Sequence, residues 1–164
     1  MSRPGVTLLR GPLDAVLVAG PGERYVDVDD PTAGLALLPA DAPAPNGLAC
    51  ELSYDSGPAE RAAAYLLMVT FAVPAQALPV FDDWYDTEHS PLLLRAPSWL
   101  RIRRLLAPSA PPGERNCFVL HDLADLDVLD GPERLAAQRG PKRAVVAAQP
   151  WYATSRRWTF TPYR

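Results

Sequence analysis

The residues with the greatest chemical potential lie together at positions 82–91, in the segment DDWYDTEHSP. His89 is one of only two histidines in the chain, and aspartate, glutamate, tyrosine and tryptophan side chains surround it in sequence. An unperturbed imidazole has a pKa of about 6.5, so His89 could act as a general acid or base near neutral pH. Hydrophobic sequence lies on both sides of the segment. Titratable groups set into core-forming sequence point to a site there.

A helix over this segment would bring several of these side chains into useful positions. Residues four apart share a helix face, so Tyr85 and His89 would point the same way. Tyr85 could donate a hydrogen bond to a developing oxyanion. Asp86 or Glu88 could fix the tautomer of His89 and raise its basicity. The expected catalytic residues are therefore His89, Glu88, Tyr85 and Asp86.

Pro91 bears on how open this site would be. A proline lacks a backbone N–H and disfavours helical geometry at the preceding residue, Ser90. We therefore expect a kink or break at His89–Ser90 that places the imidazole beside an opening. A purely structural interpretation stays open, in which the aromatic side chains pack a helix onto a sheet and the acids lie in solvent.

A second set of side chains could bind a substrate. The histidine that ends an expected strand could line a cavity with Asp122 or lie at the surface. Arginines of two expected strands, Arg101, Arg103 and Arg104 in one and Arg156 and Arg157 in the other, could bind a carboxylate or phenolate, or form salt bridges with the acidic N-terminal residues. Tryptophans could form a wall of an aromatic pocket or belong to the core. The expected substrate-binding residues are Trp84, Trp99, Arg101, Arg103 and His121.

Several classes of protein and site are disfavoured. The net charge of −3 argues against a nucleic-acid partner. The sequence has no run of about 18 apolar residues and no secretory signal, so we expect a cytoplasmic protein without membrane contact. It has no phosphate-binding loop, nucleophile elbow or metal-ligand spacing. We expect no cofactor and no metal, with Cys50 and Cys117 reduced.

The elements that would position the site differ between two parts of the chain. Residues 1–60 hold nine acidic and three basic side chains, whereas residues 61–164 hold ten and thirteen. The first part predicts short strands between turns and no amphipathic helix, so it is a β-rich N-terminal extension or a degenerate first repeat. Its expected strands are residues 6–10, 15–19, 24–28, 35–38 and 48–54.

Residues 61–164 predict one ferredoxin-like α+β domain. Strands are expected at residues 64–73, 99–106, 116–121 and 151–161, and helices at residues 76–94 and 132–148. This βαββαβ order gives a four-stranded antiparallel sheet with both helices on one face. The other face would be bare and would need a cover, usually a second copy of the chain. We therefore expect a homodimer.

The motif residues also carry a family resemblance. DWYDTEHSPL at residues 83–92, followed by APSWLR at residues 96–101, resembles the EthD-like branch of the dimeric α/β-barrel superfamily over about residues 63–164. Ser98 stands where that turn usually has glycine. The resemblance implies two ferredoxin-like units packed sheet to sheet, each with a cavity between its sheet and helices. His89 would face that cavity, with Tyr85, Trp84 and Glu88 around it.

Three functions follow from the residues and the resemblance together. The first is a small cofactor-independent enzyme of specialised metabolism, a lyase, cyclase or isomerase that uses acid–base chemistry on a hydrophobic, aromatic or polyketide-like substrate. The second is a cofactor-free monooxygenase, in which the substrate's own carbanion reduces dioxygen. The third is a non-catalytic protein that binds a small molecule. If residues 1–60 covered the bare sheet face, the chain would instead be a pseudo-dimeric monomer.

Overall fold

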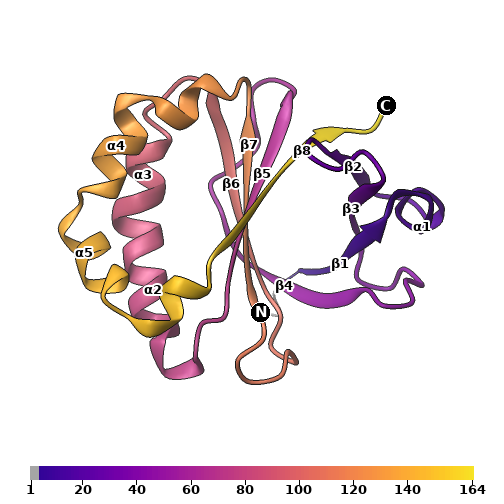
Figure 1. Cartoon of the computed structure of the whole chain (residues 1–164), viewed down its shortest axis with the longest axis horizontal. Helices are drawn as coiled ribbons and strands as arrows, with labels where there is room; N and C mark the ends of the chain where they lie inside the picture. The colour runs from indigo at the N-terminus through magenta and orange to yellow at the C-terminus, as the bar shows by residue number, and fades with distance from the viewer. Residues whose placement is uncertain (1–3) are drawn as a thin grey trace.

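The computed structural model describes residues 4–164, whose strands form one closed barrel (Figure 1). The order around the barrel is β1-β3-β2-β8-β5-β7-β6-β4, and every neighbouring pair is antiparallel. Closure leaves no strand edge unpaired. The strands are β1 (Gly5–Pro12), β2 (Glu23–Asp27), β3 (Ala33–Pro39), β4 (Leu48–Asp55), β5 (Tyr65–Phe71), β6 (Trp99–Leu106), β7 (Cys117–Leu123) and β8 (Arg156–Pro162).

The C-terminal half has the expected ferredoxin-like fold. Its strands lie in the order β8-β5-β7-β6, and helices cover the outer face of this sheet (Figure 1). These elements are α2 (Leu78–Trp84), η2 (Tyr85–His89), α3 (Ser90–Leu93), α4 (Pro132–Gln138) and α5 (Pro141–Ala147), with short 3-10 helices η1 (Ala75–Ala77), η3 (Asp127–Asp130) and η4 (Pro150–Thr154). In the described part of the chain no helix is long and apolar enough to cross a membrane.

The N-terminal half closes the barrel. Its strands lie in the order β4-β1-β3-β2, the same order by position as in the C-terminal half, and join the other sheet through β2–β8 and β4–β6. The barrel expected from two copies is therefore formed within one chain. The bare sheet face on which the expected homodimer depended is covered. A degenerate repeat would have this strand order, and that interpretation of residues 1–60 stays a prediction.

One helix of the N-terminal half contradicts the sequence-based prediction. The expected strand at residues 15–19 is instead part of α1 (Leu13–Val18). Leu13 and Val16 are three residues apart, which suits one helix face, but six residues are too few for periodicity to identify a helix. Val16 is fully buried on the outer side of the barrel, against Leu9 and Leu38. Tertiary packing of this one side chain stabilises the helix.

The helix that carries the motif contains a π-helical turn instead of a break. The N–H of Ser90 donates to the carbonyl of Tyr85, five residues earlier, and α3 follows without interruption. In a regular helix the ring of Pro91 would clash with the carbonyl of Thr87, four residues before it. The wider turn relieves that clash. π-helical turns of this kind are frequent at functional sites.

Two other expected elements are shorter in the structure. The expected helix at residues 132–148 is divided at Gly140 into α4 and α5. A Cβ at Gly140 would collide with the carboxylate of Glu88, so only glycine allows this approach. The expected strand at residues 151–161 begins at Arg156, because η4 precedes it.

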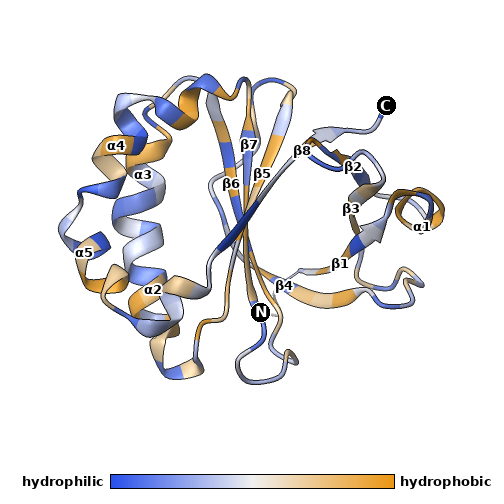
Figure 2. Ribbon diagram, viewed as in Figure 1, coloured by the Kyte–Doolittle hydropathy of each residue, from blue (hydrophilic) through white to orange (hydrophobic). Residues whose placement is uncertain are grey.

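Apolar side chains form layers on both faces of the C-terminal sheet. Leu67, Val69 and Phe71 of β5 pack toward the helices, whereas Leu66 and Met68 pack inside the barrel. Strands buried on both faces are continuously apolar. β8 differs, because hydrophilic residues occupy its first part while β5 beside it is largely hydrophobic (Figure 2). That polar part of β8 lies at the site described next.

Candidate functional site

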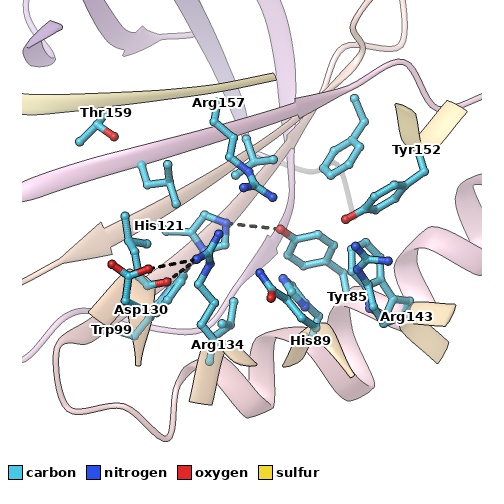
Figure 3. A pocket seen from close by; sticks show the side chains of 17 residues that line it. Tyr85, His89, Trp99, His121, Asp130, Arg134, Arg143, Tyr152, Arg157 and Thr159 are labelled. Atoms are coloured by element: carbon cyan, nitrogen blue, oxygen red, sulfur yellow. Dashed lines mark hydrogen bonds and ion pairs between the residues drawn. The ribbon is translucent and has the colours of Figure 1, made fainter. Parts of the chain in front are cut away.

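A cavity of about 350 Å³ lies between the outer face of the C-terminal sheet and its helices (Figure 3). Side chains from β5, β6, β7, β8 and the helical layer line it. The size falls near the lower end of the usual range for small-molecule sites, about 300–1,000 Å³. Five of the residues singled out in the sequence meet here, namely Trp84, Tyr85, His89, Trp99 and His121.

A chain of hydrogen bonds connects three of these side chains. Trp99 Nε1 donates to His121 Nδ1 at 3.1 Å, and His121 Nε2 lies 3.3 Å from the Tyr85 hydroxyl. An indole N–H can only donate, so His121 Nδ1 must be the acceptor. The neutral ring then carries its proton on Nε2 and donates it to Tyr85. The hydroxyl hydrogen of Tyr85 is left to point to another acceptor.

Burial keeps these groups uncharged. His121 is 1% exposed, and desolvation holds its pKa well below the usual histidine range, with the nearby His89 and Arg157 acting in the same direction. Burial also raises the pKa of Tyr85 above the ordinary tyrosine value. Tyr85 is therefore a neutral hydrogen-bond donor at the cavity wall.

His89 lies against the same aromatic group. Its ring centroid is 4.7 Å from that of Trp84 and 4.9 Å from that of Tyr85. The pKa of His89 is lowered to about 4, mainly by burial; the backbone carbonyl of Ala137 acts in the opposite direction, and the positive charges of Arg143 and Arg157 act in the same direction as burial. Its Nδ1 is buried and has no hydrogen-bond partner among residues 4–164. At neutral pH His89 is an uncharged and weakly basic imidazole.

Asp86 does not orient His89. Its carboxylate accepts two hydrogen bonds from Arg104, at 2.6 and 3.3 Å, and Asp82 lies 3.1 Å from the same guanidinium. Arg104 is 1% exposed, and a buried cation needs such partners. The two aspartates therefore attach the helix to β6.

Glu88 does not orient His89 either. Its carboxylate accepts the backbone N–H groups of Lys142, at 3.0 Å, and Arg143, at 2.8 Å. These N–H groups belong to the first turn of α5, which has no partner for them within the helix. Glu88 thus fixes the start of α5 and, with it, the position of Arg143 at the cavity.

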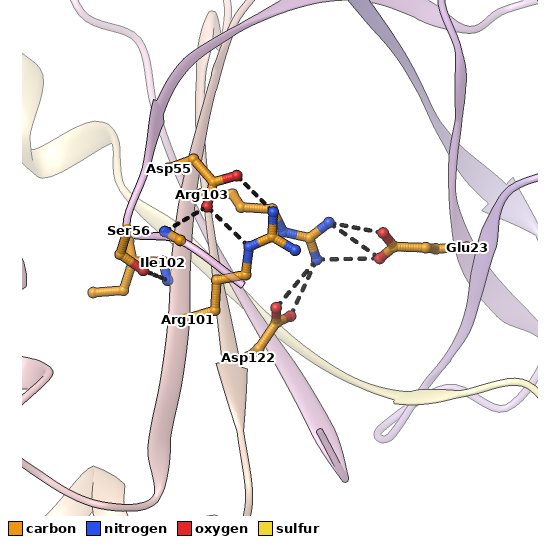
Figure 4. A network of polar contacts seen from close by, with 8 residues as sticks. Glu23, Asp55, Ser56, Arg101, Ile102, Arg103 and Asp122 are labelled. Atoms are coloured by element: carbon orange, nitrogen blue, oxygen red, sulfur yellow. Dashed lines mark hydrogen bonds and ion pairs between the residues drawn. The ribbon is translucent and has the colours of Figure 1, made fainter. Parts of the chain in front are cut away.

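The two arginines expected to bind substrate lie on the other face of the sheet. Arg103 contacts Glu23, at 2.9 Å, and Asp122, at 3.1 Å, while Arg101 pairs with Asp55 at 2.5 Å (Figure 4). Neither arginine lines the helix-side cavity. The alternative interpretation was salt bridges to the acidic N-terminal half. The pair of Arg101 with Asp55 and the contact of Arg103 with Glu23 agree with it.

His121 and Asp122 do not act as a pair. His121 faces the helices and Asp122 faces the barrel interior, because successive residues of a strand point to opposite faces. β7 also continues to Leu123, so His121 lies within the strand and not at its end. Its role at the cavity depends on Trp99 and Tyr85 instead.

Other cavity residues were not identified as site residues from sequence. Arg134 and Arg143 come from α4 and α5, Tyr152 from η4, and Arg157 from β8. Arg157 was one of the strand arginines for which substrate binding and salt bridges were both left open. The helical arginines resemble ordinary surface charges in sequence. No group of three or more histidine, cysteine, aspartate or glutamate side chains that could hold a metal ion occurs in residues 4–164.

Comparison with known proteins identifies the fold. No family model and no curated protein sequence matches the chain. Among solved structures, a ferredoxin-fold protein of Listeria monocytogenes related to antibiotic biosynthesis monooxygenases has a TM-score of 0.64 at 10% identity, covering 100% of this chain and 96% of that one. A monooxygenase-like protein of Listeria innocua has a TM-score of 0.66 at 8% identity, with 99% and 95% covered. A heme-degrading enzyme of Listeria monocytogenes has a TM-score of 0.62 at 11% identity, with 96% and 98% covered.

These similarities extend over the whole chain, including the N-terminal half, and establish the ferredoxin-like fold. They also correct the first expected function. The named neighbours are monooxygenase-like proteins and a heme-degrading enzyme, so the lyase, cyclase or isomerase prediction is wrong and the monooxygenase alternative agrees better. Membership of the EthD-like branch stays a prediction.

Proposed function

We propose that this protein is a cofactor-independent monooxygenase that oxidises a small aromatic substrate in the helix-side cavity. The observation that carries the proposal is the hydroxyl of Tyr85, held by His121 and Trp99 as a donor at an aromatic cavity. The names of the structural neighbours support this class of reaction. The Tyr85, His89, His121, Trp84 and Trp99 side chains form the proposed site.

The substrate would enter as an enolate or phenolate, because His89 is too weak a base to remove a proton efficiently at neutral pH. Tyr85 would donate its hydroxyl hydrogen to the substrate oxygen. A fixed donor in a site that excludes water stabilises such an oxygen more than solvent does. Trp84 and Trp99 would hold the ring so that its carbanionic carbon stays open to dioxygen.

The reaction balances without another reductant. The carbanionic carbon bonds one oxygen atom of O₂, and the O–O bond of this peroxide then breaks. The carbon becomes a carbonyl, and the second oxygen leaves with the remaining C–H hydrogen as hydroxide. One enolate and one O₂ therefore give one ketone and one hydroxide ion. The substrate itself supplies the two electron pairs that reduce O₂.

The heme-degrading neighbour makes heme a substrate to test. The cavity of about 350 Å³ suits two or three fused aromatic rings better than a tetrapyrrole. We therefore propose a fused-ring substrate. A heme titration followed by its visible absorption would serve as the comparison in the experiment below.

The test is oxygen uptake with anthrone in mildly alkaline buffer, where the acidic CH₂ group of this three-ring compound loses a proton and gives the required enolate. The purified full chain should consume one O₂ per anthraquinone formed, faster than buffer alone and unchanged by a metal chelator. Tyr85→Phe is the matched variant, since it removes only the hydroxyl. Oxygen uptake no faster than in buffer would contradict the proposal. Tight binding of anthrone without uptake would favour the non-catalytic alternative.

A further inference from the structure

Three guanidinium groups from three different elements meet at the cavity. Arg134 comes from α4, Arg143 from α5 and Arg157 from β8 (Figure 3). Asp130 is the one acidic residue among the described residues that line the cavity. Its side chain is 98% exposed and lies 4.0 Å from Arg134. The cavity therefore has more positive than negative charge.

Two of these arginines have no carboxylate partner within residues 4–164. The guanidinium of Arg143 lies 4.3 Å from the ring centre of Tyr152, while that of Arg157 has neither a hydrogen bond nor an ion pair to the described chain. This differs from Arg101, Arg103 and Arg104, each of which has at least one carboxylate within 3.1 Å.

The positive charges of the cavity arginines repel one another. Burial lowers the pKa of Arg134, and the positive charge of Arg157 lowers it further. The same charges help to keep His89 neutral. Like charges beside a partly enclosed, low-dielectric space raise the local potential and attract an anion. A bound anion would relieve this repulsion.

Unpaired polar atoms lie among the same residues. Trp84 Nε1 and His89 Nδ1 are both buried without a hydrogen-bond partner in the described chain. Buried polar groups are nearly always paired, and each unpaired one destabilises the folded protein. A ligand with polar atoms could satisfy them. The ring faces of Trp84, Tyr85 and Tyr152 provide aromatic contact beside them.

We infer that the ligand of this cavity is an aromatic anion whose negatively charged oxygen group is bound by Arg157, with Arg143 and Arg134 around it. The inference rests on the proposed function in taking this cavity as the substrate site. A guanidinium can bind a carboxylate through two parallel hydrogen bonds, and it binds a phenolate or enolate through one. Arg157 is therefore the residue that selects an anionic over a neutral aromatic molecule.

Binding of two probes with the same ring tests the inference without requiring turnover. 2-Naphthoate carries a carboxylate, whereas 2-naphthamide is its uncharged counterpart. By calorimetry at low salt, the wild-type full chain should bind naphthoate at least about tenfold more tightly than naphthamide. Raising the salt concentration should weaken the binding of naphthoate and leave that of naphthamide nearly unchanged.

Arg157→Gln and Arg156→Gln form a matched pair of variants on β8. Arg157→Gln should weaken naphthoate binding about tenfold and leave naphthamide unchanged. Arg156 is adjacent to Arg157 and, like it, is exposed, but it does not line the cavity and donates to the carbonyl of Ser155 at 2.9 Å. Arg156→Gln should change neither affinity.

Three results would overturn the inference: equal affinity for the two probes, binding of neither probe to the wild-type chain, or equal loss for both in Arg157→Gln. The oxygen-uptake experiment tests the proposed reaction independently of the anion site. Selective naphthoate binding without anthrone oxidation would reject the proposed reaction and keep the anion site. Anthrone oxidation by an Arg157→Gln variant at the wild-type rate and affinity would reject the anion site and keep the reaction.

Discussion

The two halves of the barrel share one order of strands but differ in what covers their outer faces. The C-terminal sheet carries α2 to α5 and a cavity with aromatic and arginine side chains. Within the described residues, the N-terminal sheet carries only α1, which packs through Val16 on Leu9, Ala36 and Leu38. The strands therefore build the barrel, and the helical layer makes the site.

The size of the side chains explains the difference. On the N-terminal half, small side chains and a six-residue helix pack together directly, and the turns of residues 40–47 stand where a second helix would follow β3. On the C-terminal half, large rings such as Trp84, Trp99 and Tyr152 separate helices from sheet. Substitutions in the two halves should therefore have different consequences for stability and activity.

The largest expected effect concerns the ion pairs that connect the halves. Arg103→Met should lower the free energy of unfolding by about 3–5 kcal/mol, because it leaves Asp122 buried without its cation and removes the contact with Glu23. Urea denaturation measures this loss. Arg101→Gln, which breaks a more exposed pair with Asp55, should cost no more than about 1 kcal/mol. Equal losses would contradict the assignment of Arg103 as the main connection.

The next prediction compares the turnover of a variant at the site with that of a variant in the N-terminal half. Tyr85→Phe should lower turnover about 100-fold, because it removes the donor to the substrate oxygen. Tyr25→Phe is the control in the N-terminal half, where Tyr25 is buried on the barrel side and donates to Glu23. Its turnover should stay within about twofold of wild type. Similar losses in both variants would show that a phenol-to-phenyl change acts through stability alone.

Acid should destabilise the C-terminal half first, since both histidines lie there. The pKa of His89 is about 4 when folded and about 6.5 when unfolded, so between these values the unfolded chain binds more protons. Stability should therefore fall as the pH falls from 6.5 to 4, by about 1–3 kcal/mol for His89. Denaturation at several pH values measures the slope. His89→Gln should flatten it, and an unchanged slope would contradict the lowered pKa.

The smallest effect concerns matched valines in the two outer layers. Val16 of α1 and Val146 of α5 are both fully buried, and each change to alanine should cost about 1–2 kcal/mol. Val16→Ala should leave turnover unchanged. Val146→Ala should lower turnover several-fold, because α5 carries Arg143. Thermal unfolding and oxygen uptake measure the two consequences separately.

Local sequence was sufficient for much of the fold and for part of the site. The alternating and apolar runs predicted most strands, and the spacing from Tyr85 to His89 placed both side chains at one cavity. Local sequence could not predict the roles of Asp86 and Glu88, because their hydrogen-bond partners, Arg104 and Arg143, lie 18 and 55 residues away in the chain. It was also insufficient for the helix α1, because six residues give too little periodicity.

By itself the sequence determined the ferredoxin-like order of the C-terminal half and five aromatic or histidine residues of the cavity (Trp84, Tyr85, His89, Trp99 and His121), since periodicity and side-chain type are local properties. The tertiary structure alone decided that the N-terminal half closes the barrel, that Trp99 fixes the tautomer of His121, and that three arginines share one cavity. These outcomes depend on which distant residues meet and how far water is excluded from them. Charge, hydrogen bonding and pKa at the site follow from that neighbourhood.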